Sequence, residues 1–162
     1  MNRYLSIEDL ENSDNKVVYF TFNDKIEGID CVEPVCAKLC AKSLGDFVQI
    51  SGNVKTKVIL ECDFCLEKYP YEMDFNIEEL YAKNALIEGD TEEYEIKDGQ
   101  FVTDLNGEKE IDIYDLLYQS VILNFPNKKV CGINCKGKEF LQNDEVPDPR
   151  LDVFKNIEIN PK

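Results

Sequence analysis

The sequence contains no histidine and no tryptophan. Without histidine, neither a Ser-His-Asp nor a Cys-His catalytic arrangement can form, and a zinc site cannot use imidazole. Long apolar runs are also missing, since no stretch approaches the roughly 18 apolar residues of a membrane span. The opening segment, Met1 to Glu8, lacks the apolar core of a signal peptide. We therefore expect a soluble, cytoplasmic protein that does not enter membranes.

Sequence motifs that carry catalysis are missing as well. No glycine-rich phosphate loop of the Walker or dinucleotide type occurs. Carboxylates such as Glu78, Glu79, Glu92 and Glu93 are numerous, but their spacing does not single out an acid–base pair. These absences predict a protein that binds rather than an enzyme.

The length of the chain bounds its organisation. With 162 residues, of which 43% are hydrophobic, it can bury one core but hardly two. We predict a single domain spanning residues 1–162. Within it we expect a solvated acidic loop at residues 86–109, interrupted at most by a short strand near residues 93–96, and an irregular tail at residues 141–162.

Acidic side chains outnumber basic ones by 33 to 18, and the surplus is concentrated in the middle of the chain. Residues 61–120 carry 18 acidic and 4 basic side chains, a net charge of −14, whereas residues 121–162 carry 6 and 7, a net charge of +1. The middle third should repel phosphate and attract basic partners. The basic residues of the last third include Lys128, Lys129, Lys136 and Lys138, which have no acid between them. Direct contact with RNA is expected at these lysines, and the alternative is that they only solubilise a loop.

Seven cysteines are present, and two close pairs stand out. Without a secretory signal, cysteines are more often reduced thiols or metal ligands than disulfides. Cys62-x-x-Cys65 and Cys131-x-x-x-Cys135 can together supply four thiolates to one tetrahedral zinc ion. Four reduced, metal-free cysteines at two loop tips are the alternative.

Other roles for the cysteines fit the sequence less well. A redox role for the first pair is disfavoured because the neighbouring acids Glu61, Asp63 and Glu67 oppose thiolate formation. The remaining thiols, at Cys31, Cys36 and Cys40, are expected to be small hydrophobic residues or exposed thiols.

Alternating apolar residues predict most of a sheet. Residues 16–22 are rich in β-branched and aromatic side chains, which predicts a strand. Residues 34–42 alternate between apolar and polar, which favours a strand, and the alternative is a helix, since alanine, lysine and leucine also suit one. From Phe47 to Cys62 the period of two is unbroken, which favours one long strand, bent or bulged at Gly52, over a hairpin turn there. A second long strand follows Cys65, so the first cysteine pair should lie at a hairpin tip. Pro70 predicts that this second strand lies at the sheet edge.

One helix is predicted after the acidic loop. Asp112 is suited to cap its N-terminus, and Pro126 ends the segment. Its apolar stripe should pack on the sheet. The resulting fold class is α+β, with a curved antiparallel sheet, one C-terminal helix packed on it, and a candidate four-cysteine zinc site.

Four segments then occur in a specific order: Val58 to Leu66, Glu110 to Pro126, Cys131 to Gly137, and Asp148 to Leu151. Together they resemble the YceD family, the large ribosomal RNA subunit accumulation proteins, over roughly residues 15–155. The chain departs from most relatives at Phe64, where arginine is usual, and after Gly137, where further cysteines are common.

The resemblance implies a non-enzymatic role in the accumulation or processing of large-subunit ribosomal RNA. Two partners are compatible with it. The protein can contact ribosomal RNA or a pre-ribosomal particle through its cysteines and lysines, or it can escort a basic ribosomal protein that docks on residues 61–120.

Overall fold

The computed structural model describes residues 3–83 and 101–137. The chain forms two compact units. We call Met1–Leu60 together with Tyr69–Asn127 the sheet unit, and Glu61–Lys68 together with Lys128–Lys162 the cysteine unit. The single domain over residues 1–162 stays a prediction.

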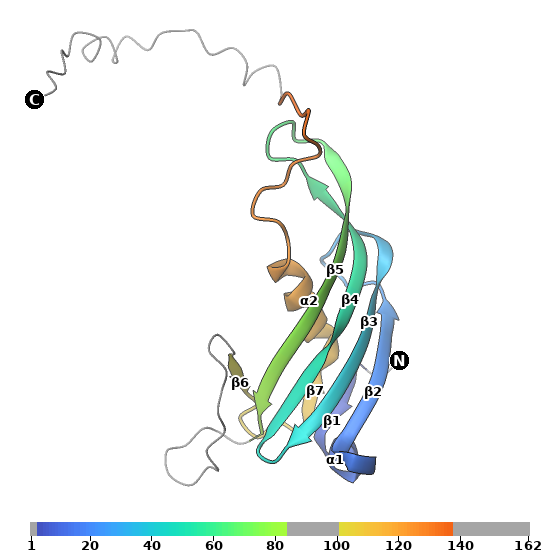
Figure 1. Ribbon diagram of the computed structural model, residues 1–162, viewed down its shortest axis with the longest axis vertical. Coiled ribbons are helices and arrows are strands. Elements are labelled where there is room, and N and C mark those ends of the chain that lie inside the picture. Colours follow the sequence, from blue (N-terminus) through green and yellow to red (C-terminus); the bar gives the residue numbers. More distant parts are fainter. Residues whose placement is uncertain (1–2, 84–100, 138–162) are drawn as a thin grey trace, which may run out of the picture. The chain divides into compact units, whose positions relative to one another are not determined.

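A five-stranded sheet forms the body of the sheet unit (Figure 1), in the order β2-β3-β4-β5-β6. Its strands are β2 (Val17–Asp24), β3 (Cys31–Leu44), β4 (Phe47–Glu61), β5 (Lys68–Ala82) and β6 (Val102–Asp104). β3 pairs antiparallel with both β2 and β4. The predicted α+β class and curved sheet are confirmed, with the difference that β6 pairs parallel to β5, so the sheet is mixed.

β4 is one continuous strand, as its period of two predicts. Its inward residues Val48, Ile50, Val54 and Val58 are fully buried. The pairing of Leu39 with Gly52 is regular, and the irregularities lie instead in β3, between Cys31 and Cys36. The strand was expected to be bent or bulged at Gly52, and its pairing with β3 has no bulge there. The bulged stretch of β3 contains Pro34, which cannot donate to a ladder.

Gly52 allows the backbones of β3 and β4 to approach each other closely. A Cβ atom at this position would lie 2.1 Å from the carbonyl oxygen of Lys38 and 2.9 Å from Cα of Leu39. Both neighbours are backbone atoms that cannot rotate away. The close approach of β3 and β4 therefore requires glycine here.

The prediction that β5 is the edge strand is wrong. β6 pairs with its last residues, Leu80 to Ala82, and extends the sheet beyond it. Pro70 is accommodated because it lies near the start of β5, away from the residues that β6 pairs with. β6 also falls within the stretch predicted as a loop, while residues 86–100 of that loop and the strand expected near residues 93–96 lie outside the described residues.

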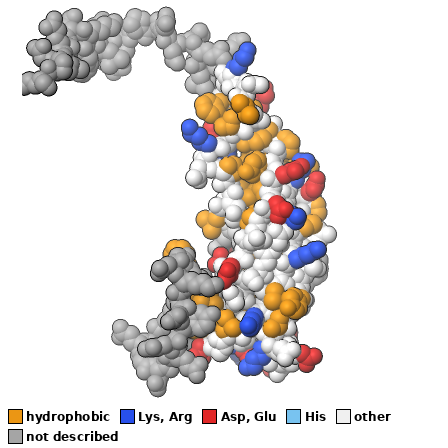
Figure 2. Space-filling view, viewed as in Figure 1, with side chains coloured by type: hydrophobic (Ala, Val, Ile, Leu, Met, Phe, Trp, Pro, Cys, Tyr) orange, Lys and Arg blue, Asp and Glu red, His pale blue; other side chains and the backbone are white. Residues whose placement is uncertain are grey.

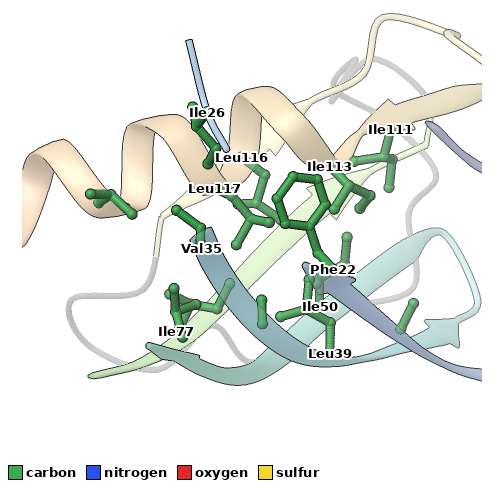
Figure 3. Packing of buried hydrophobic residues seen from close by; sticks show 14 of the residues in the cluster. Phe22, Ile26, Val35, Leu39, Ile50, Ile77, Ile111, Ile113, Leu116 and Leu117 are labelled. Carbon is green, nitrogen blue, oxygen red and sulfur yellow. The ribbon is translucent and has the colours of Figure 1, made fainter. Parts of the chain in front are cut away.

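α2 (Ile113–Leu123) confirms the predicted helix. The carboxylate of Asp112 caps it by accepting hydrogen bonds from the amides of Tyr114 and Asp115, at 2.9 and 3.1 Å. The buried face of α2 packs into one apolar core with the inward side chains of the sheet (Figure 3), where Leu116 and Leu117 lie near Phe22 and Val35. Neither α1 nor α2, the α-helices of the described residues, could span a bilayer.

The N-terminal segment adds elements that periodicity does not predict. β1 (Tyr4–Ser6) pairs antiparallel with β7 (Glu110–Asp112), and the short helix α1 (Ile7–Asn12) follows. Glu11 of α1 accepts hydrogen bonds from Ser43 and Lys83 and forms an ion pair with Lys16. The contacts with Ser43 and Lys83 attach α1 to the C-terminal ends of β3 and β5.

Candidate metal centre

Two short segments of the cysteine unit carry the four candidate ligands. Cys62 and Cys65 lie in the turn between the end of β4 and the start of β5, as the sequence predicts. The amide of Leu66 donates to the carbonyl of Cys62 at 2.9 Å and closes this turn. In the second segment, the amide of Cys135 donates to the carbonyl of Gly132 at 3.1 Å. Each cysteine pair therefore projects from its own tight turn.

The four sulfur atoms lie within 4.8 Å of one another. The Sγ atoms of Cys62 and Cys135 are 3.7 Å apart, and those of Cys65 and Cys131 are 3.6 Å apart. Four sulfurs around a tetrahedral zinc at about 2.3 Å would be separated by about 3.8 Å. The Cys62–Cys135 and Cys65–Cys131 sulfur pairs match this spacing, and no two of the four sulfurs are more than 4.8 Å apart. The cysteines are therefore close enough to bind a metal ion.

Hydrogen bonds hold the two turns together. The amide of Asp63 donates to the carbonyl of Lys129 at 2.8 Å, and the Asp63 carboxylate accepts a hydrogen bond from the amide of Lys129, also at 2.8 Å. The amide of Cys131 donates to the sulfur of Cys62 at 3.4 Å. Asp63 thus positions the second cysteine pair against the first, a role that the sequence analysis missed.

The protonation of the thiols differs across the cluster. Hydrogen bonds from backbone amides, that of Cys65 foremost and then Cys131 and Phe64, lower the pKa of Cys62 to about 6. The neighbouring thiols of Cys65 and Cys135, together with burial, raise the pKa of Cys131 to about 12. Without a cation, a second thiol of the cluster loses its proton less readily once Cys62 is a thiolate, because the two negative charges repel each other. A divalent metal ion removes this conflict because its charge stabilises all four thiolates.

The predicted lysines surround the second cysteine pair in sequence. Lys128 and Lys136 are exposed and Lys129 is partly buried, while Lys138 lies outside the described residues. Phe64, between the cysteines of the first pair, leaves 43% of its surface exposed. The cysteine unit therefore presents cationic and aromatic side chains to solvent.

The other three cysteines do not join the cluster. They lie on β3, where Cys36 is exposed and donates to the amide oxygen of Asn23 at 3.3 Å. Cys31 and Cys40 are partly buried. This agrees with the expectation of small hydrophobic residues or exposed thiols.

Comparison with known proteins assigns the family. A family model described as the large ribosomal RNA subunit accumulation protein YceD matches residues 50–158, or 109 of the 162 residues. The chain therefore belongs to the YceD family. This match covers most of β4, all of β5 and α2, and both cysteine pairs. The family is named for a link to the ribosome rather than for a reaction. Neither the curated proteins nor the solved structures include a match to the chain.

Proposed function

We propose that the protein is a non-catalytic, cytoplasmic factor that promotes the accumulation or processing of large-subunit ribosomal RNA. Membership of the YceD family is the observation that carries this proposal. The geometry adds a four-cysteine cluster of the kind that stabilises small binding modules.

The cluster holds one zinc ion in this proposal, with Cys62, Cys65, Cys131 and Cys135 as ligands. Zinc suits four thiolates in tetrahedral geometry, and the closed ligand set leaves no position for a reacting water molecule. The ion is therefore structural and holds the two turns together. Metal-free reduced cysteines remain the competing state.

RNA is contacted by the cysteine unit. Lysines 128, 129, 136 and 138 offset the charge of −2 that four thiolates leave around a zinc ion, and they meet phosphate groups. The exposed ring of Phe64 supplies a surface on which an unpaired base can stack. The resulting interface is small, so we expect moderate affinity.

Charge reversal tests this contact. A variant with Lys128→Glu, Lys129→Glu and Lys136→Glu should no longer co-sediment with large-subunit precursors on density gradients. A matched variant, with Lys25→Glu, Lys38→Glu and Lys42→Glu, changes three exposed lysines of the sheet unit and should still co-sediment. Equal retention of both variants on the particles would rule out contact through the cysteine unit.

A second candidate function is escort of a basic ribosomal protein. The observation that favours it is a group of carboxylates beside α2 that line one groove, most of them without an ion-pair partner among the described residues. Neutralising Glu92, Glu93 and Glu95, which belong to the same acidic third of the sequence, should weaken such an association. An unchanged level of co-purified basic protein would argue against their involvement.

A further inference from the structure

A groove of about 460 Å³ lies beside α2 in the sheet unit. Its walls come from the end of β5, from β6 and the segment that follows it, and from one flank of α2. Among residues 3–83 and 101–137, neither lysine nor arginine lines this groove. Six carboxylates do: Glu79, Asp104, Glu108, Glu110, Asp112 and Asp115.

Most of this negative charge is uncompensated. Asp112 forms an ion pair with Arg3 at 2.8 Å, and within residues 3–83 and 101–137 it is the only one of the six that pairs with a cation. Elsewhere on the sheet, neighbouring charges are paired, as Lys55 with Asp74 and Lys57 with Glu72, and Figure 2 shows basic and acidic side chains side by side over the strands. The groove therefore differs from the ordinary charged surface of this protein.

Tyr81 marks the groove as a place for a ligand. Its side chain lines the groove, only 9% of the residue is exposed, and no described residue forms a hydrogen bond with its hydroxyl. Burial, followed by the charges of Glu79 and Asp115, raises the pKa of Tyr81, so the hydroxyl stays protonated at neutral pH. The ring is packed while the hydroxyl reaches solvent, so the hydroxyl can bind a polar group that enters the groove.

Two large apolar side chains accompany the carboxylates. Phe101 and Leu123 also line the groove, and they are 83% and 81% exposed. Exposed apolar side chains beside a polar rim are typical of surfaces that bind another protein. The groove thus offers both negative charge and apolar area.

We propose that this groove binds a basic segment of a partner protein, with lysine or arginine side chains on the carboxylates and an apolar side chain against Phe101 and Leu123. This inference rests on the second candidate function, to which it adds a site and a recognition chemistry. The hydroxyl of Tyr81 donates a hydrogen bond to the backbone of the bound segment.

Charge complementarity favours a basic segment over three other possible occupants: RNA, a second copy of the chain, and the chain's own residues 84–100. Phosphate groups of RNA would be repelled by the carboxylates. A second copy of the chain carries a net charge of −15. The chain's own residues 84–100 contain six acidic side chains and one basic side chain. Of these occupants, only a basic partner is attracted electrostatically by the carboxylates of the groove.

The test uses the full chain and a fluorescent eight-residue peptide of lysine, arginine and leucine. Fluorescence anisotropy should show binding that weakens as salt is raised, and a peptide with glutamine in place of each cationic residue should not bind. A groove variant with Glu79→Gln, Glu108→Gln and Asp115→Asn should bind the cationic peptide about tenfold more weakly. Leu123→Ser should weaken binding several-fold at every salt concentration, because its contribution is apolar.

A charge-matched control separates the groove from general attraction. The variant with Glu27→Gln, Glu33→Gln and Asp46→Asn neutralises three exposed carboxylates outside the groove and should bind the peptide as the unmodified protein does. Equal losses in both triple variants, or no binding by the unmodified protein, would overturn the inference. It would equally be overturned if the groove variant lost binding to an RNA oligonucleotide, or if it dissociated a dimer of the protein.

The same variants distinguish this inference from the escort function itself. If the peptide binds in the groove but no basic ribosomal protein associates with the chain in cells, the inference stands and the escort function fails. If a basic ribosomal protein associates equally with the unmodified protein and the groove variant, escort stands and the groove is not its site.

Discussion

Asp63 and Lys129 exchange two hydrogen bonds across the candidate metal centre, each 2.8 Å long. One joins the amide of Asp63 to the carbonyl of Lys129, and the other joins the amide of Lys129 to the Asp63 carboxylate. Because each residue adjoins one cysteine pair, this exchange aligns the pairs before any ion binds. Preorganised ligands lose less conformational entropy on metal binding.

Asp63→Ala removes the carboxylate half of this exchange and should lower zinc affinity about tenfold. Asp63→Asn keeps an oxygen that accepts the Lys129 amide and should lower it less. Competition with a chromogenic chelator measures both affinities. If the alanine variant bound zinc as tightly as the unmodified protein, the exchange would have no part in holding the centre.

Zinc content tests the ligand set itself. Protein purified under reducing conditions should contain about one zinc ion per chain, and a variant with Cys62→Ser and Cys131→Ser should contain essentially none. The matched variant, with Cys36→Ser and Cys40→Ser, alters cysteines outside the cluster and should keep its zinc. Elemental analysis of the three proteins gives the answer, and a metal-free unmodified protein that binds no added zinc would contradict the assignment.

The contacts of Glu11 with Lys83, Ser43 and Lys16 predict that the protein loses part of its folding stability in acid. Hydrogen bonds from Lys83, and then from Ser43 and Lys16, lower the pKa of Glu11 from 4.5 to about 2. Because the folded pKa is lower than the unfolded one, this stabilisation is complete above about pH 4.5 and is lost as the pH falls toward about 2. The carboxylate is 31% exposed, so the contribution is about 1–2 kcal/mol rather than the roughly 3 kcal/mol of the full shift.

Urea unfolding of a Glu11→Gln variant measures this contribution. The variant should be less stable than the unmodified protein at pH 7, and the difference should shrink as the pH is lowered below 4.5. Glu27→Gln, at an exposed position, is the control and should show no such trend. A difference between Glu11→Gln and the unmodified protein that stayed constant down to pH 3 would show that the charge of Glu11 is not its source.

Gly52→Ala tests the close approach of β3 and β4. Because the added Cβ atom would lie 2.1 Å from a backbone oxygen, the strands must separate locally, and the free energy of unfolding should fall by roughly 2–3 kcal/mol. At Gly132 an added Cβ atom meets nothing within 4 Å, so Gly132→Ala should leave stability nearly unchanged. Thermal unfolding compares the two, and equal midpoints would contradict the packing described for Gly52.

Periodic patterns explain how much of the fold could be predicted. β4 and α2 bury one face each over many residues, so the periods of 2 and 3.6 are visible in the sequence. β1, β6 and β7 have three residues each, too few to show a period. The parallel pairing of β6 with β5 is a tertiary contact that no local pattern encodes.

The candidate site likewise has parts that local sequence predicts and parts that depend on tertiary contacts. Residue type and spacing predicted that the four cysteines meet, because thiolate pairs of this kind share one ion. Asp63 was missed because its partner is a backbone group 66 residues away, and the neighbouring charges suggested only opposition to thiolates. The groove beside α2 combines β5, β6 and α2, and only the folded chain brings these segments together.

If the protein promotes accumulation of large-subunit ribosomal RNA, cells that lack it should contain less of this RNA relative to small-subunit ribosomal RNA. The most direct measurement is the ratio of large-subunit to small-subunit ribosomal RNA in cells that lack the protein and express a plasmid copy. The unmodified protein and the Cys36→Ser, Cys40→Ser variant should restore a normal ratio, whereas the Cys62→Ser, Cys131→Ser variant should leave it low. A normal ratio in cells without any copy of the protein would contradict the account.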